Sequence, residues 1–155
     1  YNRRGLSELG KVEFARSVRM NNPLSAIMID LDHFKRVNDA YGHAAGDQVL
    51  CEYANRCKNC VREIDYIGRY GGEEIVILLP DTSLNASLAV AERLRVAIAN
   101  APIRLSEGQE LNITASLGVT CKDENITSLE MLIARADQAM YTAKHRGRNQ
   151  IASDY

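Results

Sequence analysis

Two short apolar runs constrain the fold of this chain more than any other feature. Residues 24–29 and 75–79 are each too short for a buried helix, and their aliphatic side chains suit buried strands. A further apolar stretch, residues 64–70, leads into Gly71-Gly72, and the run 75–79 leads out of that dipeptide. Apolar stretches on both sides of a Gly-Gly pair are typical of a β-hairpin. We therefore expect a sheet in which 64–70 and 75–79 form a hairpin.

Amphipathic segments occupy most of the chain between these strands. The pattern predicts helices over residues 4–20, 33–40, 44–62 and 83–100, and a last helix that starts at a capping box over 127–130 and stops at Gly147. It also predicts a strand pair, 103–105 with 111–120, and a short edge strand over 149–152. This order contains a β-α-β-β-α-β core, so we expect an α/β (α+β) fold with a ferredoxin-like, mostly antiparallel central sheet flanked by helices.

Length and charge limit the classes of function. The 155 residues suit a single domain, 1–155. The chain starts abruptly at Tyr1, so we expect it to be part of a longer multidomain regulator. Its 19 Lys and Arg against 20 Asp and Glu argue against a nucleic-acid or membrane-surface binder, both of which need a clearly basic face. The longest apolar run, 75–79, is far short of the roughly 20 residues that span a bilayer.

The cysteines indicate packing rather than chemistry. Cys57 and Cys60 form one C-x-x-C within the expected helix 44–62, without a second pair or a nearby histidine at ligand spacing. Redox or metal roles remain as alternatives for them. Thiols that stay reduced suit a cytoplasmic protein.

Three acidic residues point to a cation site. Asp30 ends the first expected strand, and Glu73 and Glu74 follow the Gly-Gly pair. If those strands are neighbours, the carboxylates converge at one edge and repel one another unless a cation lies between them. Oxygen ligands of this kind suit Mg²⁺, held by one or two carboxylates together with substrate phosphates. Taken singly, an Asp at a strand end is more often solvated or a helix cap, and Gly-Gly is more often only a turn.

Several motifs together resemble one family. Residues 69–75 (RYGGEEI) are similar to the signature of the GGDEF domain family, the bacterial diguanylate cyclases. Residues 30–47 (DLDHFKRVNDAYGHAAGD) match the family's other long motif, and 135–149 (RADQAMYTAKHRGRN) match its C-terminal motif. Residues 1–4 resemble the end of its opening segment, so the resemblance covers essentially the whole chain. It implies the fold of nucleotide cyclase and polymerase palm domains.

The resemblance implies a metal-dependent catalytic centre. Asp30 and the backbone carbonyl of Leu31 would bind Mg²⁺, with Mn²⁺ as a substitute and two ions in each half-site. Glu73 would be a metal ligand and the base for the 3′-hydroxyl, and Glu74 would support the second metal. Lys35 would belong to the catalytic group through its contact with the phosphates.

The resemblance also implies how substrate is held. Asn38 and Asp47 would bind the guanine edge, which suits an amide and a carboxylate. The backbone around Asp32–Lys35, which includes Phe34, would hold the phosphates, and Gly71 and Gly72 would let the nucleotide approach the chain closely.

Two cations would hold the triphosphate. We expect Lys144 and Arg148, four residues apart at a helix end, to share a face and grip it together. Taken alone, this pair could instead be a basic helix end that complements the helix dipole.

The implied reaction condenses two GTP molecules to cyclic di-GMP and two pyrophosphates. Each domain would bind one GTP, so a homodimer with antiparallel sites is required. The motif Arg62-Glu-Ile-Asp65, together with Arg93, resembles the family's inhibitory product site, although R-x-x-D alone usually marks a surface ion pair.

One position of the signature departs from the family. Ile75 stands where the family has Phe, in a place that should face the core. Two other readings of the chain remain open. It could be a catalytically silent module that senses cyclic di-GMP or GTP, or a purely structural α/β domain.

Overall fold

The computed structural model describes residues 1–154. The helices within this range are α1 (Arg3–Met20), α2 (Phe34–Tyr41), α3 (His43–Lys58), α4 (Leu84–Ala99) and α5 (Leu129–His145). The strands are β1 (Leu24–Leu31), β2 (Tyr66–Arg69), β3 (Glu74–Pro80), β4 (Ile103–Arg104), β5 (Glu110–Leu111), β6 (Ala115–Cys121) and β7 (Ile151–Ser153). None of the described helices is long and apolar enough to cross a membrane.

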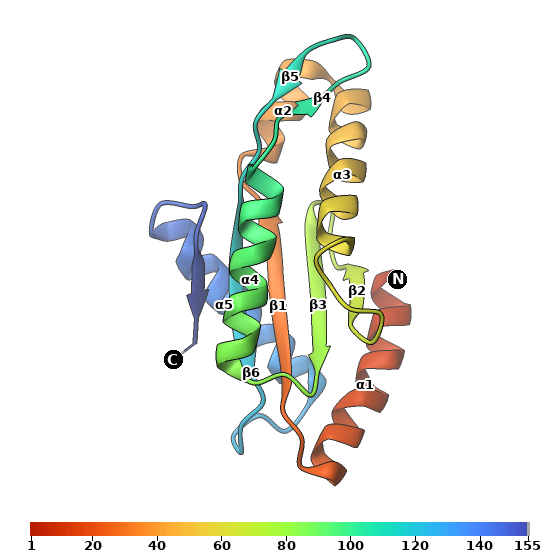
Figure 1. The fold of residues 1–155 in the computed structure, drawn as a ribbon, viewed down its shortest axis with the longest axis vertical. Helices are drawn as coiled ribbons and strands as arrows, with labels where there is room; N and C mark the ends of the chain where they lie inside the picture. The colour runs from red at the N-terminus through yellow and green to blue at the C-terminus, as the bar shows by residue number, and fades with distance from the viewer. Residues whose placement is uncertain (155) are drawn as a thin grey trace.

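The main sheet has the order β2-β3-β1-β6-β7 (Figure 1). Its neighbouring strands are antiparallel except for β6 and β7, which run parallel. β1, β2, β3 and β6, with α3 and α4 as crossovers, make the ferredoxin-like β-α-β-β-α-β arrangement. The expected fold class is confirmed, including the hairpin around Gly71-Gly72.

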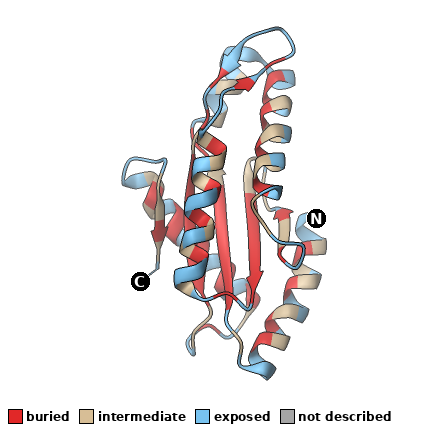
Figure 2. Ribbon diagram, in the orientation of Figure 1, coloured by how far each residue is buried: buried red, intermediate tan, exposed pale blue. Residues whose placement is uncertain are grey.

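Helices cover both faces of this sheet. Alternate side chains of β1 point to opposite faces, as they must in a strand. Ile27 and Ile29 pack with α3 and α4 in one buried cluster, and Ala26 and Met28 pack with α1 and α5 in another. Because both faces are covered, the central strands are buried along most of their length (Figure 2). This explains why β1 and β3 read as unbroken apolar runs rather than as alternating patterns.

Some element boundaries differ from those expected. α3 ends at Lys58 rather than at residue 62, so Cys60 lies in the following turn. Cys57 is fully buried in the core, where burial raises the pKa of its thiol well above the usual range. The packing interpretation is therefore confirmed for Cys57, whereas its placement with Cys60 in one helix was wrong.

The second expected strand pair was only partly correct. Residues 103–104 do form a hairpin with 110–111, but that hairpin is a separate two-stranded sheet. Residues 115–121 form their own strand, β6, which pairs with β1. A bend at residues 112–114 therefore divides what looks like one strand in the sequence.

The cap of α5 is shifted by one residue from the expected capping box. Ser128, in an extended conformation, accepts a hydrogen bond from the Met131 amide at 3.1 Å. The Thr127 hydroxyl instead contacts the Met131 sulfur. Thr127 as the N-cap was therefore wrong, because the Ser128 side chain is the one that accepts from the first turn of the helix.

Candidate active site

The acidic residues meet at one end of the central strands. In the β1–β3 pair, Asp30 lies directly opposite Glu74, and Ser116 of β6 lies on its other side. Glu73 is in the turn that precedes β3. The convergence expected from the sequence is therefore present in the structure.

The surroundings of the Asp30 carboxylate disfavour its ionised form. Its side chain is only 14% exposed, and its Oδ1 is a buried oxygen without a hydrogen-bond partner among the described residues. The pKa of Asp30 is raised to about 7, chiefly by burial; Lys144 opposes the rise, and Glu73 and Glu74 add to it. Burial also raises the pKa of Glu74. A carboxylate pair of this kind is stabilised by any cation that enters between them.

These residues suit a hard cation shared with phosphates. Within residues 1–154, no group of three His, Cys, Asp or Glu side chains is arranged to hold a metal ion alone. Mg²⁺ does not need such a cage, since it usually takes one or two carboxylates together with substrate phosphates and water. The buried Asp30 oxygen, which accepts no hydrogen bond from the described residues, and Glu74 opposite it fit that requirement. Leu31, the last residue of β1, places its backbone beside them.

Lys144 is the cation nearest to this cluster. Its Nζ lies 3.5 Å from Asp30 Oδ1 and 3.9 Å from Asp32 Oδ1. It is in the last turn of α5, as expected, but Arg148 is not on the same helix. Arg148 lies in the turn after α5, exposed and with a left-handed φ of 64°. The prediction that the two share a helix face was wrong, because α5 ends at His145.

Asp32 anchors that turn, a role that the sequence analysis missed. Its side chain is 1% exposed. It accepts hydrogen bonds from the Thr114 hydroxyl at 2.7 Å, the Ser116 hydroxyl at 2.6 Å and the Asn149 amide at 3.0 Å. Asp32 thus joins the end of β1 to β6 and to the segment that carries Arg148. The spacing of Asp30 and Asp32 was a usable signal, since Asp32 directly follows β1 and residues two apart in extended chain share a face.

The residues expected to read guanine lie on α2 and α3. A Cβ at Gly46 would collide with the Asn38 carboxamide and come within 3.3 Å of Phe34 Cζ. Gly46 therefore makes room for Asn38, and it precedes Asp47 in the chain. Gly46 thus lets α3 approach Asn38 and Phe34 of α2 closely, and the joint binding of guanine by Asn38 and Asp47 stays a prediction.

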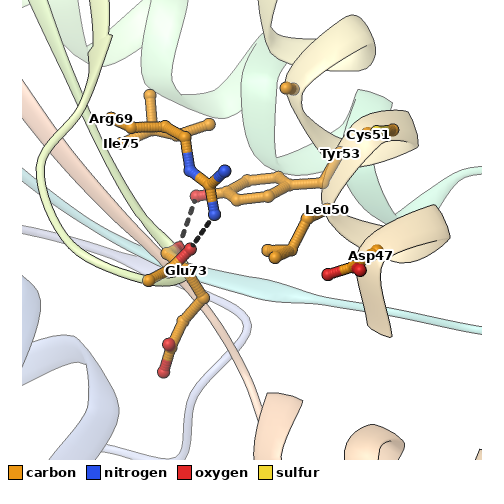
Figure 3. Close-up of a pocket in the computed structure, with 9 residues that line it drawn as sticks. Asp47, Leu50, Cys51, Tyr53, Arg69, Glu73 and Ile75 are labelled. Carbon is orange, nitrogen blue, oxygen red and sulfur yellow. Dashed lines mark hydrogen bonds between the residues drawn. The ribbon is translucent and has the colours of Figure 1, made fainter. Parts of the chain in front are cut away.

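Asp47 also lines a cavity of about 240 Å³ that reaches the signature turn (Figure 3). The cavity walls come from α3, β2, β3 and the turn: Asp47, Leu50, Cys51, Tyr53, Ala54, Arg69, Gly72, Glu73 and Ile75. Gly72 has open space where a side chain would be, whereas a Cβ at Gly71 would meet the Glu74 carboxylate. Lys35 is exposed in the first turn of α2, and the structure joins it to none of these residues by a described contact.

Two side chains hold the signature turn by its backbone. The Arg69 guanidinium donates to the Gly72 carbonyl, and the Tyr53 hydroxyl donates to the Glu73 carbonyl at 3.1 Å (Figure 3). Neither role was predicted from the sequence. A tyrosine on the buried face of a helix has the pattern of an ordinary core residue.

Comparison with protein families is decisive. The family model described as "Diguanylate cyclase, GGDEF domain" matches residues 1–150. The chain belongs to this family. Magnesium dependence is general among the cyclases of the family.

Curated relatives agree with this assignment. Diguanylate cyclase DgcP of Pseudomonas aeruginosa is 46% identical over 150 residues, which are 97% of this chain and 22% of DgcP. Diguanylate cyclase A of Treponema denticola is 45% identical over 128 residues, 83% of this chain and 34% of that protein. The response regulator PleD of Caulobacter vibrioides is 44% identical over 88% of this chain and 30% of PleD. The chain thus spans about a third or less of these relatives.

Solved structures of single GGDEF domains share this fold over nearly their whole length. The active GGEEF domain of a diguanylate cyclase from Vibrio cholerae has a TM-score of 0.92 at 35% identity, with 99% of this chain and 97% of that one covered. The GGDEF domain of PA1120 from Pseudomonas aeruginosa has a TM-score of 0.94 at 33% identity, with 99% and 95% covered.

In this GGDEF domain the two charged side chains of the R-x-x-D motif bind each other. Asp65 accepts from the Arg62 amide at 2.7 Å and from its guanidinium at 2.8 Å, and the Asp65 side chain is 2% exposed. Arg62 also donates to Pro80 and Thr82, although half of its side chain stays exposed. Arg93 donates to the Cys60 carbonyl at 2.6 Å, beside the same turn. Both Asp65 carboxylate oxygens are thus engaged within the chain, whereas Arg93 and half of the Arg62 side chain are exposed.

Ile75 occupies the last position of the GGDEF signature. It is 3% exposed and lies opposite Ile29 in β1 and Arg69 in β2. The side chain is part of the core, as expected, and it also lines the cavity next to Tyr53.

Proposed function

We propose that this GGDEF domain is a diguanylate cyclase, which condenses two GTP molecules to cyclic di-GMP and two pyrophosphates. The observation that carries the proposal is the register of Asp30 opposite Glu74, with the half-exposed Glu73 beside them at the mouth of the cavity that Asp47 lines. The family membership and the cyclases among its relatives support it.

The reaction is a nucleotidyl transfer at phosphorus. The 3′-oxygen of one GTP attacks the α-phosphorus of the other, and the bond from that phosphorus to the bridging oxygen of the β-phosphate breaks. Pyrophosphate leaves with the electron pair of that bond. The hydroxyl proton passes to the Glu73 carboxylate, which acts as the general base. The same transfer in the opposite direction closes the ring.

The other side chains bind and orient the substrate. Asn38 and Asp47 fix the guanine edge, so that the wrong base leaves polar groups unpaired. Lys144, Arg148 and Lys35, with the backbone from Asp32 through Phe34, hold the triphosphate. Because Lys144 already lies beside Asp30, phosphates that it binds are brought to the carboxylate cluster.

Mg²⁺ would be held by Asp30, the Leu31 carbonyl, Glu73 and Glu74, and would offset charge on the phosphates and acidify the 3′-hydroxyl. Two ions in each half-site, with Mn²⁺ able to replace Mg²⁺, are part of the proposal. The raised pKa values of Asp30 and Glu74 support a bound cation, since it would remove the cost of ionising both.

A single domain offers one base-binding cavity and one catalytic turn. We infer that two copies face each other antiparallel, so that each supplies one GTP. A homodimer is then a requirement for catalysis, and its formation is a point of control. Since GTP is a cytoplasmic nucleotide, we place the domain in the cytoplasm.

Product feedback through Arg62, Asp65 and Arg93 is the last part of the proposal. Asp65 would hold Arg62 in place, and the exposed half of Arg62, together with Arg93, would bind the guanine edge or phosphate of cyclic di-GMP. The GGDEF domain of DgcB from Caulobacter crescentus, which is 27% identical to this chain, has been solved in complex with cyclic di-GMP.

Incubation with GTP and Mg²⁺, followed by chromatography of the products, tests the cyclase assignment. Wild-type protein should form cyclic di-GMP and pyrophosphate, and Glu73→Ala should form neither while it keeps its fold. Tight binding of cyclic di-GMP without turnover, even in an enforced dimer, would instead identify a silent sensor module.

A further inference from the structure

Tyr53 makes a buried polar contact that the proposed chemistry does not use. It lies on α3 with 1% of its surface exposed. Its hydroxyl is 3.1 Å from the Glu73 carbonyl and 3.3 Å from the Ile29 carbonyl. A hydroxyl has one hydrogen to donate, so the shorter contact, to Glu73, is the main bond.

The two carbonyls that this hydroxyl meets belong to the catalytic edge of the sheet. Ile29 directly precedes Asp30, and Glu73 directly precedes Glu74, the residue opposite Asp30. Tyr53 therefore reaches across β1 and β3 just beneath the carboxylate cluster. Burial also raises the pKa of its phenol well above the usual value, so the group stays protonated and remains a donor.

Packing alone does not account for the hydroxyl. A phenylalanine would fill the same ring volume in the core without the cost of removing a hydroxyl from water. The hydroxyl is tolerated there because it meets a backbone acceptor in a turn that lacks regular strand pairing. Figure 3 shows it pointing from α3 straight at the backbone of Glu73.

We propose that the Tyr53 hydroxyl is a positioning group that holds the Glu73 turn against α3, the helix that also carries Asp47. Asp47, Tyr53 and Glu73 line one cavity, so the base-binding helix and the catalytic turn are joined by this bond. Arg69 also binds the same turn, by donating to the Gly72 carbonyl. Because Arg69 is exposed, water competes for that hydrogen bond. The inference rests on the proposed function for its catalytic part and on the geometry alone for the hold on the turn.

Tyr53→Phe tests it, with Tyr141→Phe as the matched control, because Tyr141 lies on α5 and is 62% exposed. In protein without nucleotide, amide hydrogen exchange in residues 71–75 should be about fivefold faster in Tyr53→Phe than in wild type, and unchanged in Tyr141→Phe. In the cyclase assay, kcat should fall about fivefold to tenfold while KM for GTP changes less than twofold.

The outcomes distinguish a positioning role of Tyr53 from a role in stability alone, and both of these from failure of the proposed cyclase function. Equal exchange in residues 71–75, or an unchanged kcat, would overturn the inference, even if Tm falls. If wild-type protein makes no product, the proposed function fails, and the exchange comparison still decides whether Tyr53 holds the turn. If Tyr53→Phe does not fold, wild-type protein can be tested by NMR, where a slowly exchanging Tyr53 hydroxyl proton close to Glu73 is expected and its absence contradicts the inference.

Discussion

The Asn149 amide donates a hydrogen bond of 3.0 Å to Asp32, 117 residues earlier in the chain. The same carboxylate accepts hydrogen bonds from the hydroxyls of Thr114 and Ser116 and is approached by Lys144. One buried acidic side chain thus fixes the C-terminal segment that carries Arg148, one of the proposed phosphate-binding residues, against the end of β1.

Asp32→Ala should therefore damage both stability and substrate binding. It leaves buried donors without an acceptor, and we expect a loss of about 2–3 kcal/mol in the free energy of unfolding, measured by urea denaturation. KM for GTP should rise by about tenfold as the segment around Arg148 loosens. Asp39→Ala, at an exposed position on α2, is the control and should change neither quantity. Equal stabilities of the Asp32 and Asp39 variants would rule out the anchoring role.

Gly46→Ala should impair guanine binding although alanine normally favours a helix. The new methyl would displace the Asn38 carboxamide from its place against Gly46. We expect KM for GTP to rise about fivefold to tenfold, measured by initial rates. In an Asn38→Ala background the same substitution should have little further effect. Additive effects of the two substitutions would show that Gly46 does not act through Asn38.

The raised pKa of Asp30 predicts a specific pH dependence of stability without metal. The native carboxyl, with a pKa of about 7, binds a proton more tightly than the unfolded chain does, so stability falls as the pH rises toward and through 7. Asp30→Asn removes this loss. In the presence of a chelator, the variant should be more stable than wild type by about 1 kcal/mol at pH 8, after allowance for solvent screening, and nearly equal to it at pH 4. A difference between the two proteins that stays constant from pH 4 to 8 would contradict the assigned cause.

Arg93→Ala should weaken binding of cyclic di-GMP at the inhibitory site. Arg93 is a better position to test than Arg62, because removal of Arg62 would leave the buried Asp65 carboxylate without its ion-pair partner. Titration calorimetry should show at least a tenfold loss of product affinity, and Arg19→Ala on α1 should retain the wild-type value. If Arg93→Ala binds cyclic di-GMP as tightly as wild type, the motif is only a structural ion pair.

Local sequence patterns predicted the sheet and the convergence of Asp30 with Glu74. The apolar runs and the Gly-Gly turn determine which residues form neighbouring strands, and the carboxylates are at the ends of those strands. These features depend on short-range periodicity, which the sequence displays directly.

Features that depend on distant contacts were not predictable in this way. Arg148 was expected to share a helix face with Lys144, but it adopts a left-handed conformation in a turn that Asp32 fixes. The hydrogen bonds of Arg62 to Pro80 and Thr82 and the polar contact of Tyr53 likewise join residues that meet only in the folded chain. No local preference encodes such contacts.

The initial rate of cyclic di-GMP formation, measured over a wide range of protein concentrations at saturating GTP and Mg²⁺, tests the central claim most directly. We predict that product forms and that the rate rises with the square of the protein concentration until the dimer is saturated. Glu73→Ala should give no product at any concentration. Absence of product from wild-type protein over the whole range would contradict the account.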